Sequence, residues 1–157
     1  MSNDSRMVLL KAGARICALP VESVVETMRP LPVAEVAGAP AWVLGVAMIR
    51  GAPLPVVDLD AMLGGRRATD VSRFVTVRVA ERQVALAVAA VLGVRAIAPA
   101  TLGAMPPLLS DAGAAIVEAL GVLDRELCLV VRAGRLMPEA LWTSLTAAEP
   151  RGASAQP

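Results

Sequence analysis

The amino-acid sequence predicts an all-β protein built from two small five-stranded barrels with a few short helices. Short valine-rich segments recur along the chain of 157 residues, and β-branched residues of this kind favour strands. Glycine, proline and polar clusters separate these segments at intervals of roughly eight to twelve residues, a spacing typical of all-β folds. About nine or ten short strands in a chain of this length favour two small barrels over one large sandwich.

The first part of the chain predicts a strand pair and a loop. Residues 7–13 (MVLLKAG) and 15–21 (RICALPV) are expected to be strands joined by a tight turn at Gly13. Residues 21–28 (VESVVETM) fit either a strand or a helical turn, and their valines favour a strand. Residues 29–40 contain three prolines and one glycine, so we expect a loop there.

The central segment predicts a hairpin. Residues 41–45 (AWVLG) are expected to form a short helical turn that packs its tryptophan and valine inward. Residues 45–50 (GVAMIR) and 53–59 (PLPVVDL) follow as two strands, and Gly51 supplies a tolerant backbone at the turn between them. The prolines of the second strand lack an N–H donor, so this strand either bonds through alternate residues or lies at a sheet edge.

A short helix is expected directly after this hairpin. In residues 58–63 (DLDAML), Asp58 is placed to act as the N-cap, and Gly64 and Gly65 end the turn. Asp58 and Asp60 also form a candidate acid–base pair. Because alternate strand residues face opposite ways and no nucleophile lies nearby, catalysis at this pair is a minor alternative.

The second half of the chain repeats the strand pattern. Residues 73–80 (RFVTVRVA) alternate apolar and polar side chains, which is typical of a half-buried strand. Residues 84–98 predict one long strand or two bent strands with a break near Gly93. Within them, residues 84–94 are expected to place one face in the core, and the other face is a candidate binding edge. Residues 99–114 are expected to be a loop, and residues 115–123 (AIVEALGVL) a helical turn that leads into a strand.

The C-terminal part completes the predicted domain. Residues 127–132 (LCLVVR) are expected to be the last strand, and residues 133–145 a short helix. Residues 146–157 are small, polar and proline-containing, so we expect a disordered tail. One domain over residues 7–145 is therefore predicted.

Composition limits the possible partners. Hydrophobic residues make up 56% of the chain and the mean hydropathy is +0.63. Exposed apolar surface favours a protein interface, and an alanine-rich composition without functional meaning is an equal alternative. The net charge is +1 and no basic stripe with stacking aromatics occurs, so nucleic acid is not an expected partner. The apolar runs at 39–49 and 84–94 are shorter than the roughly 20 residues of a membrane helix. Without a recognisable signal peptide, we expect a cytoplasmic protein that does not insert into the membrane.

The residue inventory argues against an enzyme. The chain contains no histidine and no tyrosine, which removes the commonest general base and metal ligand. No Cys/His metal spacing, P-loop or GxGxxG motif occurs. Cys17 and Cys128 lie in separate apolar runs and are expected to be buried thiols rather than a disulfide. The sequence therefore predicts a protein without catalytic residues, cofactor or metal.

Two segments carry a family resemblance. Residues 17–26 (CALPVESVVE) and 40–59 (PAWVLGVAMIRGAPLPVVDL) closely resemble the CheW-like family of chemotaxis coupling proteins. Residues 84–94 and 119–131 resemble later motifs of the same family. The likeness extends over about residues 7–145, nearly the whole chain.

The resemblance implies two intertwined five-stranded SH3-like barrels and a non-catalytic adaptor. Family members bridge the regulatory domain of a CheA-type histidine kinase and a chemoreceptor signalling tip, which binds in the groove between the lobes. Carried onto matching positions, the resemblance implies partner-binding roles for Val24, Glu26, Gly45, Arg50 and Gly51.

Four positions depart from the family pattern, namely Thr27, Met48, Ala89 and Arg132. They favour a divergent member, and binding of only one of the two usual partners is an alternative. A β-barrel that binds a small ligand in its cleft is a second alternative. A hydrolase that uses its aspartates is a third.

The proposed site residues also have local interpretations. Arg50 either reaches a partner with its fork of donors or forms a local ion pair with Glu26 or Asp58. Val24 and Glu26 fit an apolar contact beside a charged rim. They equally fit a strand with one face in the core.

Overall fold

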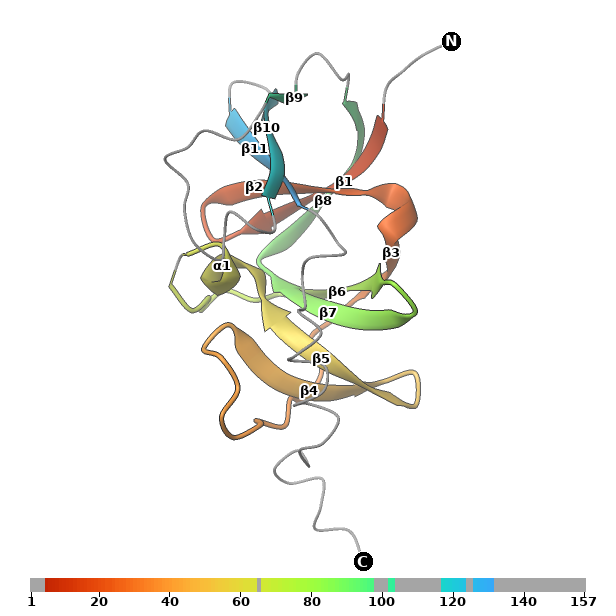
Figure 1. The fold of residues 1–157 in the computed structure, drawn as a ribbon, viewed down its shortest axis with the longest axis vertical. Coiled ribbons are helices and arrows are strands. Elements are labelled where there is room, and N and C mark those ends of the chain that lie inside the picture. The colour runs from red at the N-terminus through yellow and green to blue at the C-terminus, as the bar shows by residue number, and fades with distance from the viewer. Residues whose placement is uncertain (1–4, 65, 98–101, 104–116, 124–125, 132–157) are drawn as a thin grey trace, which may run out of the picture.

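The computed structural model describes residues 5–64, 66–97, 102–103, 117–123 and 126–131 (Figure 1). The described elements are mostly strands. In chain order they are β1 (Ser5–Ala12), β2 (Arg15–Pro20), the 3-10 helix η1 (Val21–Ser23), β3 (Val24–Met28), β4 (Val43–Ile49), β5 (Ala52–Asp58), α1 (Leu59–Met62), β6 (Arg73–Val79), β7 (Arg82–Val88), β8 (Ala90–Ile97), β9 (Leu102–Gly103), β10 (Val117–Leu123) and β11 (Glu126–Val131).

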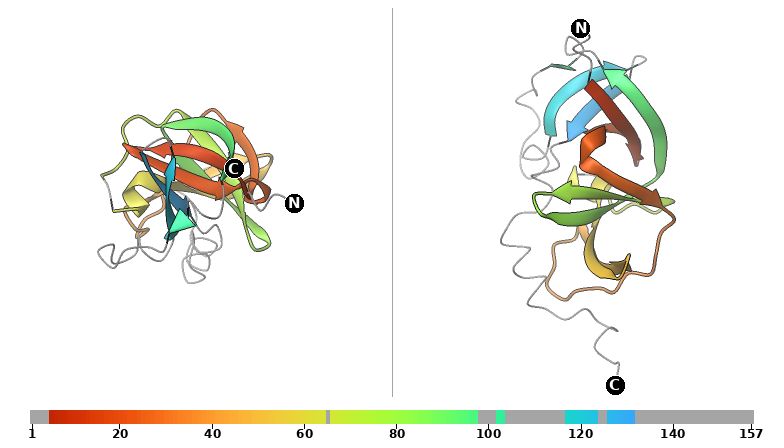
Figure 2. Two further views of the ribbon diagram at one scale, coloured as in Figure 1. Left: turned by 90° about the horizontal axis from the view of Figure 1, so that it is seen from above. Right: turned by 90° about the vertical axis from the view of Figure 1, so that its right-hand side faces the viewer.

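The strands form two sheets, which make up the two lobes of the molecule (Figures 1 and 2). The first sheet has the order β8-β1-β2-β11-β10-β9, and the second has the order β3-β6-β7-β5-β4. The chain enters the second sheet through η1 and returns to the first at Ala89, whose N–H donates to the carbonyl of Lys11 at 2.8 Å. The central strands thus form one lobe, while strands from both ends of the chain form the other. The lobes are therefore intertwined.

A single hydrophobic core joins the lobes. The first sheet contributes Val8, Leu10 and Leu19, and the second contributes Val75 and Leu86, all of them buried. A smaller apolar cluster lies within each sheet. Most residues of β1 and β7 are buried, whichever face they point to. This explains why these strands are nearly continuous aliphatic runs rather than alternating patterns.

The predicted all-β class with two lobes is confirmed, and several local predictions hold with it. Residues 21–28 contain both of the expected alternatives, since η1 is followed by β3. Pro53 and Pro55 lie opposite residues of β4, and β5 pairs with β7 only from Val56 onward. The prolines thus occupy a part of β5 that has one neighbouring strand, where no second ladder requires their missing N–H groups.

One local prediction holds only in part, and another is wrong. Residues 41–45 do not form a helical segment, because β4 begins at Val43 and pairs with β5. Only a single turn precedes the strand, closed by a hydrogen bond from the Val43 N–H to the Pro40 carbonyl at 2.9 Å, and Val43 is buried as expected. The tryptophan of this segment is half-buried and still packs against the shared core. The break in the 84–98 run lies at Ala89 rather than Gly93, because the chain crosses between the sheets there. Gly93 has a φ of +113° and lies at a β-bulge between β8 and β1.

Several predictions fall outside the described residues. These are most of the loop at 99–114, of which β9 is described, the helix at 133–145 and the tail at 146–157. Cys17 is a buried thiol as predicted, whereas the side chain of Cys128 lies outside the description. Of the helices in the described ranges, none is long and apolar enough to cross a membrane.

Candidate partner-binding site

The Arg–Gly dipeptide forms the two-residue turn of the β4–β5 hairpin. Ile49 and Ala52 pair across this turn, and Arg50 and Gly51 have φ values of +53° and +78°. Such hairpins need positive φ at both central positions, a conformation that glycine adopts freely and arginine does not. Arg50 is thus held in a strained backbone conformation while its side chain remains 80% exposed. Strain of this kind tends to persist at functional positions.

The Arg50 guanidinium forms a bidentate ion pair with Glu26 of β3. Nη2 donates to Oε1 at 2.8 Å and Nε donates to Oε2 at 3.1 Å. Because β3 and β4 are the opposite edges of the second sheet, the pair closes this sheet from edge to edge. The hydrogen bond from Arg50 lowers the pKa of the Glu26 carboxyl, and the same hydrogen bond raises the pKa of the guanidinium. Of the two partners that the sequence allowed for Arg50, the structure selects Glu26.

A β-bulge separates Val24 from Glu26. Val24 pairs with Val77 of β6, and Glu26 pairs with the preceding β6 residue, so Val25 is the extra residue of the bulge. Val24 is half-buried and packs against the shared core. The side chain of Glu26 keeps 26% of its surface exposed. The interpretation as a strand with one face in the core therefore holds for Val24, whereas Glu26 lies at the rim of the lobe.

Gly45 serves a close backbone contact inside β4. Its φ is +144°, and a Cβ added there would lie 2.1 Å from the carbonyl oxygen of Ala34. Ala34 and the neighbouring Val46 exchange two backbone hydrogen bonds of 2.8 and 2.9 Å. Gly45 thereby lets the proline-rich loop lie against the edge of β4. Gly51 differs from it, because a Cβ at that position would meet no atom within 4 Å.

A shallow hollow that the sequence did not predict lies beside the Arg–Gly turn. The hollow lies between the tips of the β4–β5 and β6–β7 hairpins, is open to solvent and measures about 490 Å³. Arg50 and Leu54 line one side, and Glu81 and Gln83 line the other. Ala80 at the second tip also has a positive φ, of +57°. The hollow leaves only a weak signal in the sequence, because the residues of each hairpin do not show that the two hairpin tips lie side by side.

Large apolar side chains remain exposed near the site and on the other lobe. Met48, two residues before the Arg–Gly turn, is 63% exposed. On β8, which is an edge of the first sheet, Leu92 and Val94 are 49% and 45% exposed. In the 84–94 run, where a binding edge was predicted, the exposed side chains thus lie on β8, while most of β7 is buried.

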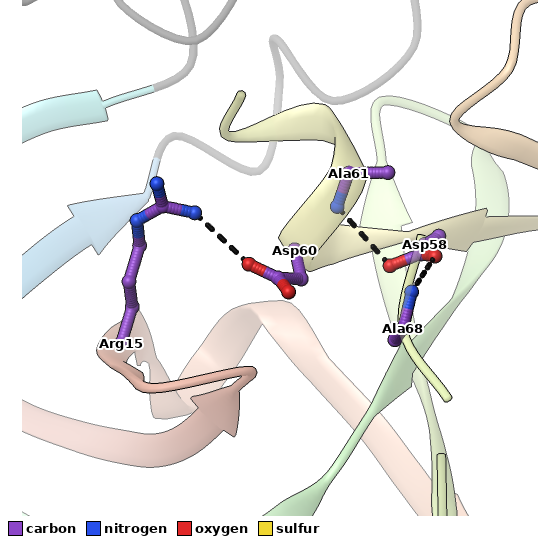
Figure 3. A network of polar contacts seen from close by, with 5 residues as sticks. All are labelled: Arg15, Asp58, Asp60, Ala61 and Ala68. Atoms are coloured by element: carbon purple, nitrogen blue, oxygen red, sulfur yellow. Dashed lines mark hydrogen bonds and ion pairs between the residues drawn. The ribbon is translucent and has the colours of Figure 1, made fainter. Parts of the chain in front are cut away.

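The two aspartates of the DLDAML segment have separate partners (Figure 3). Asp58 is fully buried and accepts hydrogen bonds from the N–H groups of Ala61 at 3.2 Å and Ala68 at 2.8 Å. The predicted N-cap is therefore confirmed. Asp60 instead pairs with Arg15 at 2.9 Å. The two aspartates thus share no hydrogen-bond partner. The described residues contain no group of three His, Cys, Asp or Glu side chains that could hold a metal.

Comparison with known proteins shows the family. The sequence model of the CheW-like domain matches residues 6–141. The chain belongs to the CheW-like family. The "Chemotaxis protein CheW" of Rhizobium meliloti (strain 1021) is 31% identical over 134 residues, which cover 83% of this chain and 86% of that protein. The "Probable chemotaxis protein CheW" of Rhizobium etli is 28% identical over 130 residues, which cover 81% and 84%.

A solved structure agrees with the fold of this CheW-like chain. The scaffolding protein TtCheW from Thermoanaerobacter tengcongensis superposes with a TM-score of 0.72 at 21% sequence identity. The match covers 82% of this chain and 89% of that protein. The predicted all-β, SH3-like architecture is thereby confirmed.

The Glu26–Arg50 pair should make a pH-dependent contribution to stability. Because the pKa of Glu26 is lowered from 4.5 in the fold, this contribution is complete above 4.5 and is lost as the pH falls through the lowered pKa. The melting temperature of Glu26→Gln should therefore lie slightly below that of the wild type from pH 7 to about pH 5, and the difference should shrink as the pH falls below 4.5. Thermal melting across this range tests the prediction. A difference that persists at low pH would assign the effect to side-chain shape rather than charge.

Proposed function

We propose that this protein is a non-catalytic adaptor of bacterial chemosensory signalling in the cytoplasm. It couples a chemoreceptor signalling tip to the regulatory domain of a CheA-type histidine kinase by protein–protein contacts. Family membership and the names of the curated relatives support a scaffold or adaptor role in chemotaxis. The observation that carries the proposal is the exposed Glu26–Arg50 pair, which stands at the closing edge of the second lobe.

The surroundings of this pair have the anatomy of an interface. Arg50 is paired and still 80% exposed, so its remaining donors are available to a partner. The exposed Met48 adds an apolar contact on the adjoining strand, and apolar centres with charged rims are typical of protein interfaces. The open shape of the hollow beside Arg50 favours a protein partner over a small ligand. The partner-binding set remains Val24, Glu26, Gly45, Arg50 and Gly51, within which Gly45 acts by holding the proline-rich loop against β4.

The departures from the family pattern bear on the choice of partner. Thr27 and Met48 lie exposed on β3 and β4, the two edge strands that the ion pair connects. Substitutions at these positions change the contact surface and leave the core untouched. They favour a protein matched to a particular receptor or kinase, and binding of one partner alone is the alternative. Ala89 lies at the crossover between the sheets, away from this rim.

A binding experiment with a charge swap tests the proposal. The purified chain is titrated by calorimetry with the receptor signalling tip and with the kinase regulatory domain of the same organism. We expect Arg50→Glu to weaken binding of at least one partner by tenfold or more, on the order of 1.4 kcal/mol. The double variant Glu26→Arg/Arg50→Glu restores the pair with its charges exchanged. If Arg50 contacts the partner directly, this double variant should fold normally and still bind weakly.

The control for this experiment is Arg67→Ala, which removes an exposed arginine from the loop after α1. It should leave both affinities unchanged. Binding of neither protein by the wild-type chain would overturn the adaptor proposal. Binding of only one would support the alternative of a divergent member with a single partner. Full binding by Arg50→Glu would remove Arg50 from the interface.

A further inference from the structure

A polar contact joins the two lobes at one margin of their boundary. Asp60 belongs to α1, which follows β5 of the second sheet, and it pairs with Arg15 at the start of β2 in the first sheet (Figures 1 and 3). Arg15 Nη1 donates to Asp60 Oδ1 at 2.9 Å. This contact bridges elements that are 45 residues apart in the chain.

The same carboxylate lies against the backbone of the β1–β2 turn. Gly13 of this turn has a φ of +59°. A Cβ on Gly13 would lie 2.4 Å from Asp60 Oδ2 and 2.7 Å from Asp60 Cγ. The hydrogen atom of a glycine is therefore the largest group that fits beneath Asp60. Gly13, Arg15 and Asp60 together form a contact that we call the inter-lobe latch.

The charge of Asp60 is not well stabilised at this place. Burial raises the pKa of its carboxyl, and the nearby Asp58 and Asp70 raise it further, while Arg15 lowers it without offsetting the rise. A raised pKa means that the fold, relative to the unfolded chain, favours the protonated form of Asp60. The geometry of the contact, an ion pair between the lobes over a turn with no room for a Cβ, instead suggests a role in conformational specificity.

We propose that the inter-lobe latch sets the orientation of one lobe relative to the other, with Asp60 as a positioning residue. The shared core holds the lobes together, and the latch adds a directional contact at the margin, where nonpolar packing alone is not directional. This role rests on the proposed adaptor function, because a partner that lies in the groove between the lobes contacts both of them. A partner that docks on a single lobe is insensitive to the latch.

The first test measures lobe orientation without any partner. Backbone N–H residual dipolar couplings are recorded for the wild type, Asp60→Ala and Arg15→Gln, and an alignment tensor is fitted to each sheet separately. We expect the two tensors to coincide in the wild type and to diverge, or to differ in magnitude, in both variants. Asp60→Asn keeps the shape of the side chain and should restore most of the wild-type agreement. Asp70→Asn is the matched control, because it removes a nearby negative charge without touching Arg15.

The second test connects the latch to binding. Asp60→Ala should weaken binding of the receptor tip on the order of tenfold, because that partner is expected in the groove between the lobes. Coincident tensors in both Asp60→Ala and Arg15→Gln would overturn the latch, whatever the binding results. If the tensors diverge but the receptor tip binds normally, the latch orients the lobes, but this orientation does not matter for binding in the groove. If Asp60→Ala does not fold, Arg15→Gln carries the same test, since Arg15 is 39% exposed.

Discussion

Replacing Gly45 with alanine is expected to lower the free energy of unfolding by about 3 kcal/mol or more. The added methyl group would lie 2.1 Å from the Ala34 carbonyl oxygen. This backbone atom cannot move away without breaking its bridge to Val46, whose two hydrogen bonds hold the proline-rich loop on β4. The φ of +144° adds backbone strain, because residues with a Cβ rarely adopt it. Urea denaturation, analysed for both midpoint and slope, measures the loss.

Gly51→Ala is the matched control for this prediction. Its φ of +78° also disfavours alanine, but no atom lies within 4 Å of the added methyl group. We expect a loss of only about 1 kcal/mol, from the left-handed backbone conformation. Equal losses at the two glycines would show that the close approach to Ala34 contributes nothing. Binding assays on the folded Gly51→Ala protein then report whether the turn itself contacts a partner.

Removing the carboxylate of Asp58 is expected to have the second-largest effect. Asp58→Ala should lower the free energy of unfolding by about 2–3 kcal/mol. The carboxylate is fully buried and accepts from two backbone N–H groups, one in α1 and one in the loop that follows. Alanine would leave both donors without this acceptor. Amide hydrogen exchange should therefore accelerate at Ala61 and Ala68 together, since one side chain holds both.

Two variants separate the cap from nonspecific charge effects. Asp58→Asn keeps one carbonyl acceptor and should be intermediate between the wild type and Asp58→Ala. Asp70→Ala removes an exposed carboxylate of the same loop and should change stability by less than about 0.5 kcal/mol. If Asp58→Ala were as stable as Asp70→Ala, the assignment of Asp58 as a structural anchor would be wrong.

The candidate site could be predicted from the sequence in part. The Arg–Gly turn is a local feature, and its place between two strands follows from the residues on either side. The partner of Arg50 could not be decided, because Glu26 lies 24 residues away and Asp58 was an equally reasonable choice. Only the curling of the second sheet brings its edge strands together. The family resemblance pointed to Gly45 but did not show why a glycine is needed there. The cause is the close approach of the proline-rich loop to β4, which only the fold brings about.

The latch shows the same limit more clearly. Asp60 in the sequence is one of two aspartates beside a short helix, and Gly13 is a turn residue. Their contact depends on how two lobes pack, which no local pattern encodes. The hollow between the hairpin tips and the exposed residues of β8 also follow from sheet order rather than from composition.

The sequence by itself determined the all-β class, most strand positions, the Asp58 cap and the absence of histidine-based chemistry. These features depend on composition and on spacings of a few residues, which local physical preferences decide. The tertiary structure alone decided which strands share a sheet, where the chain crosses between lobes and which aliphatic side chains stay exposed. It also decided that β4 starts where a helical turn was expected, because pairing with β5 outweighs a weak local preference.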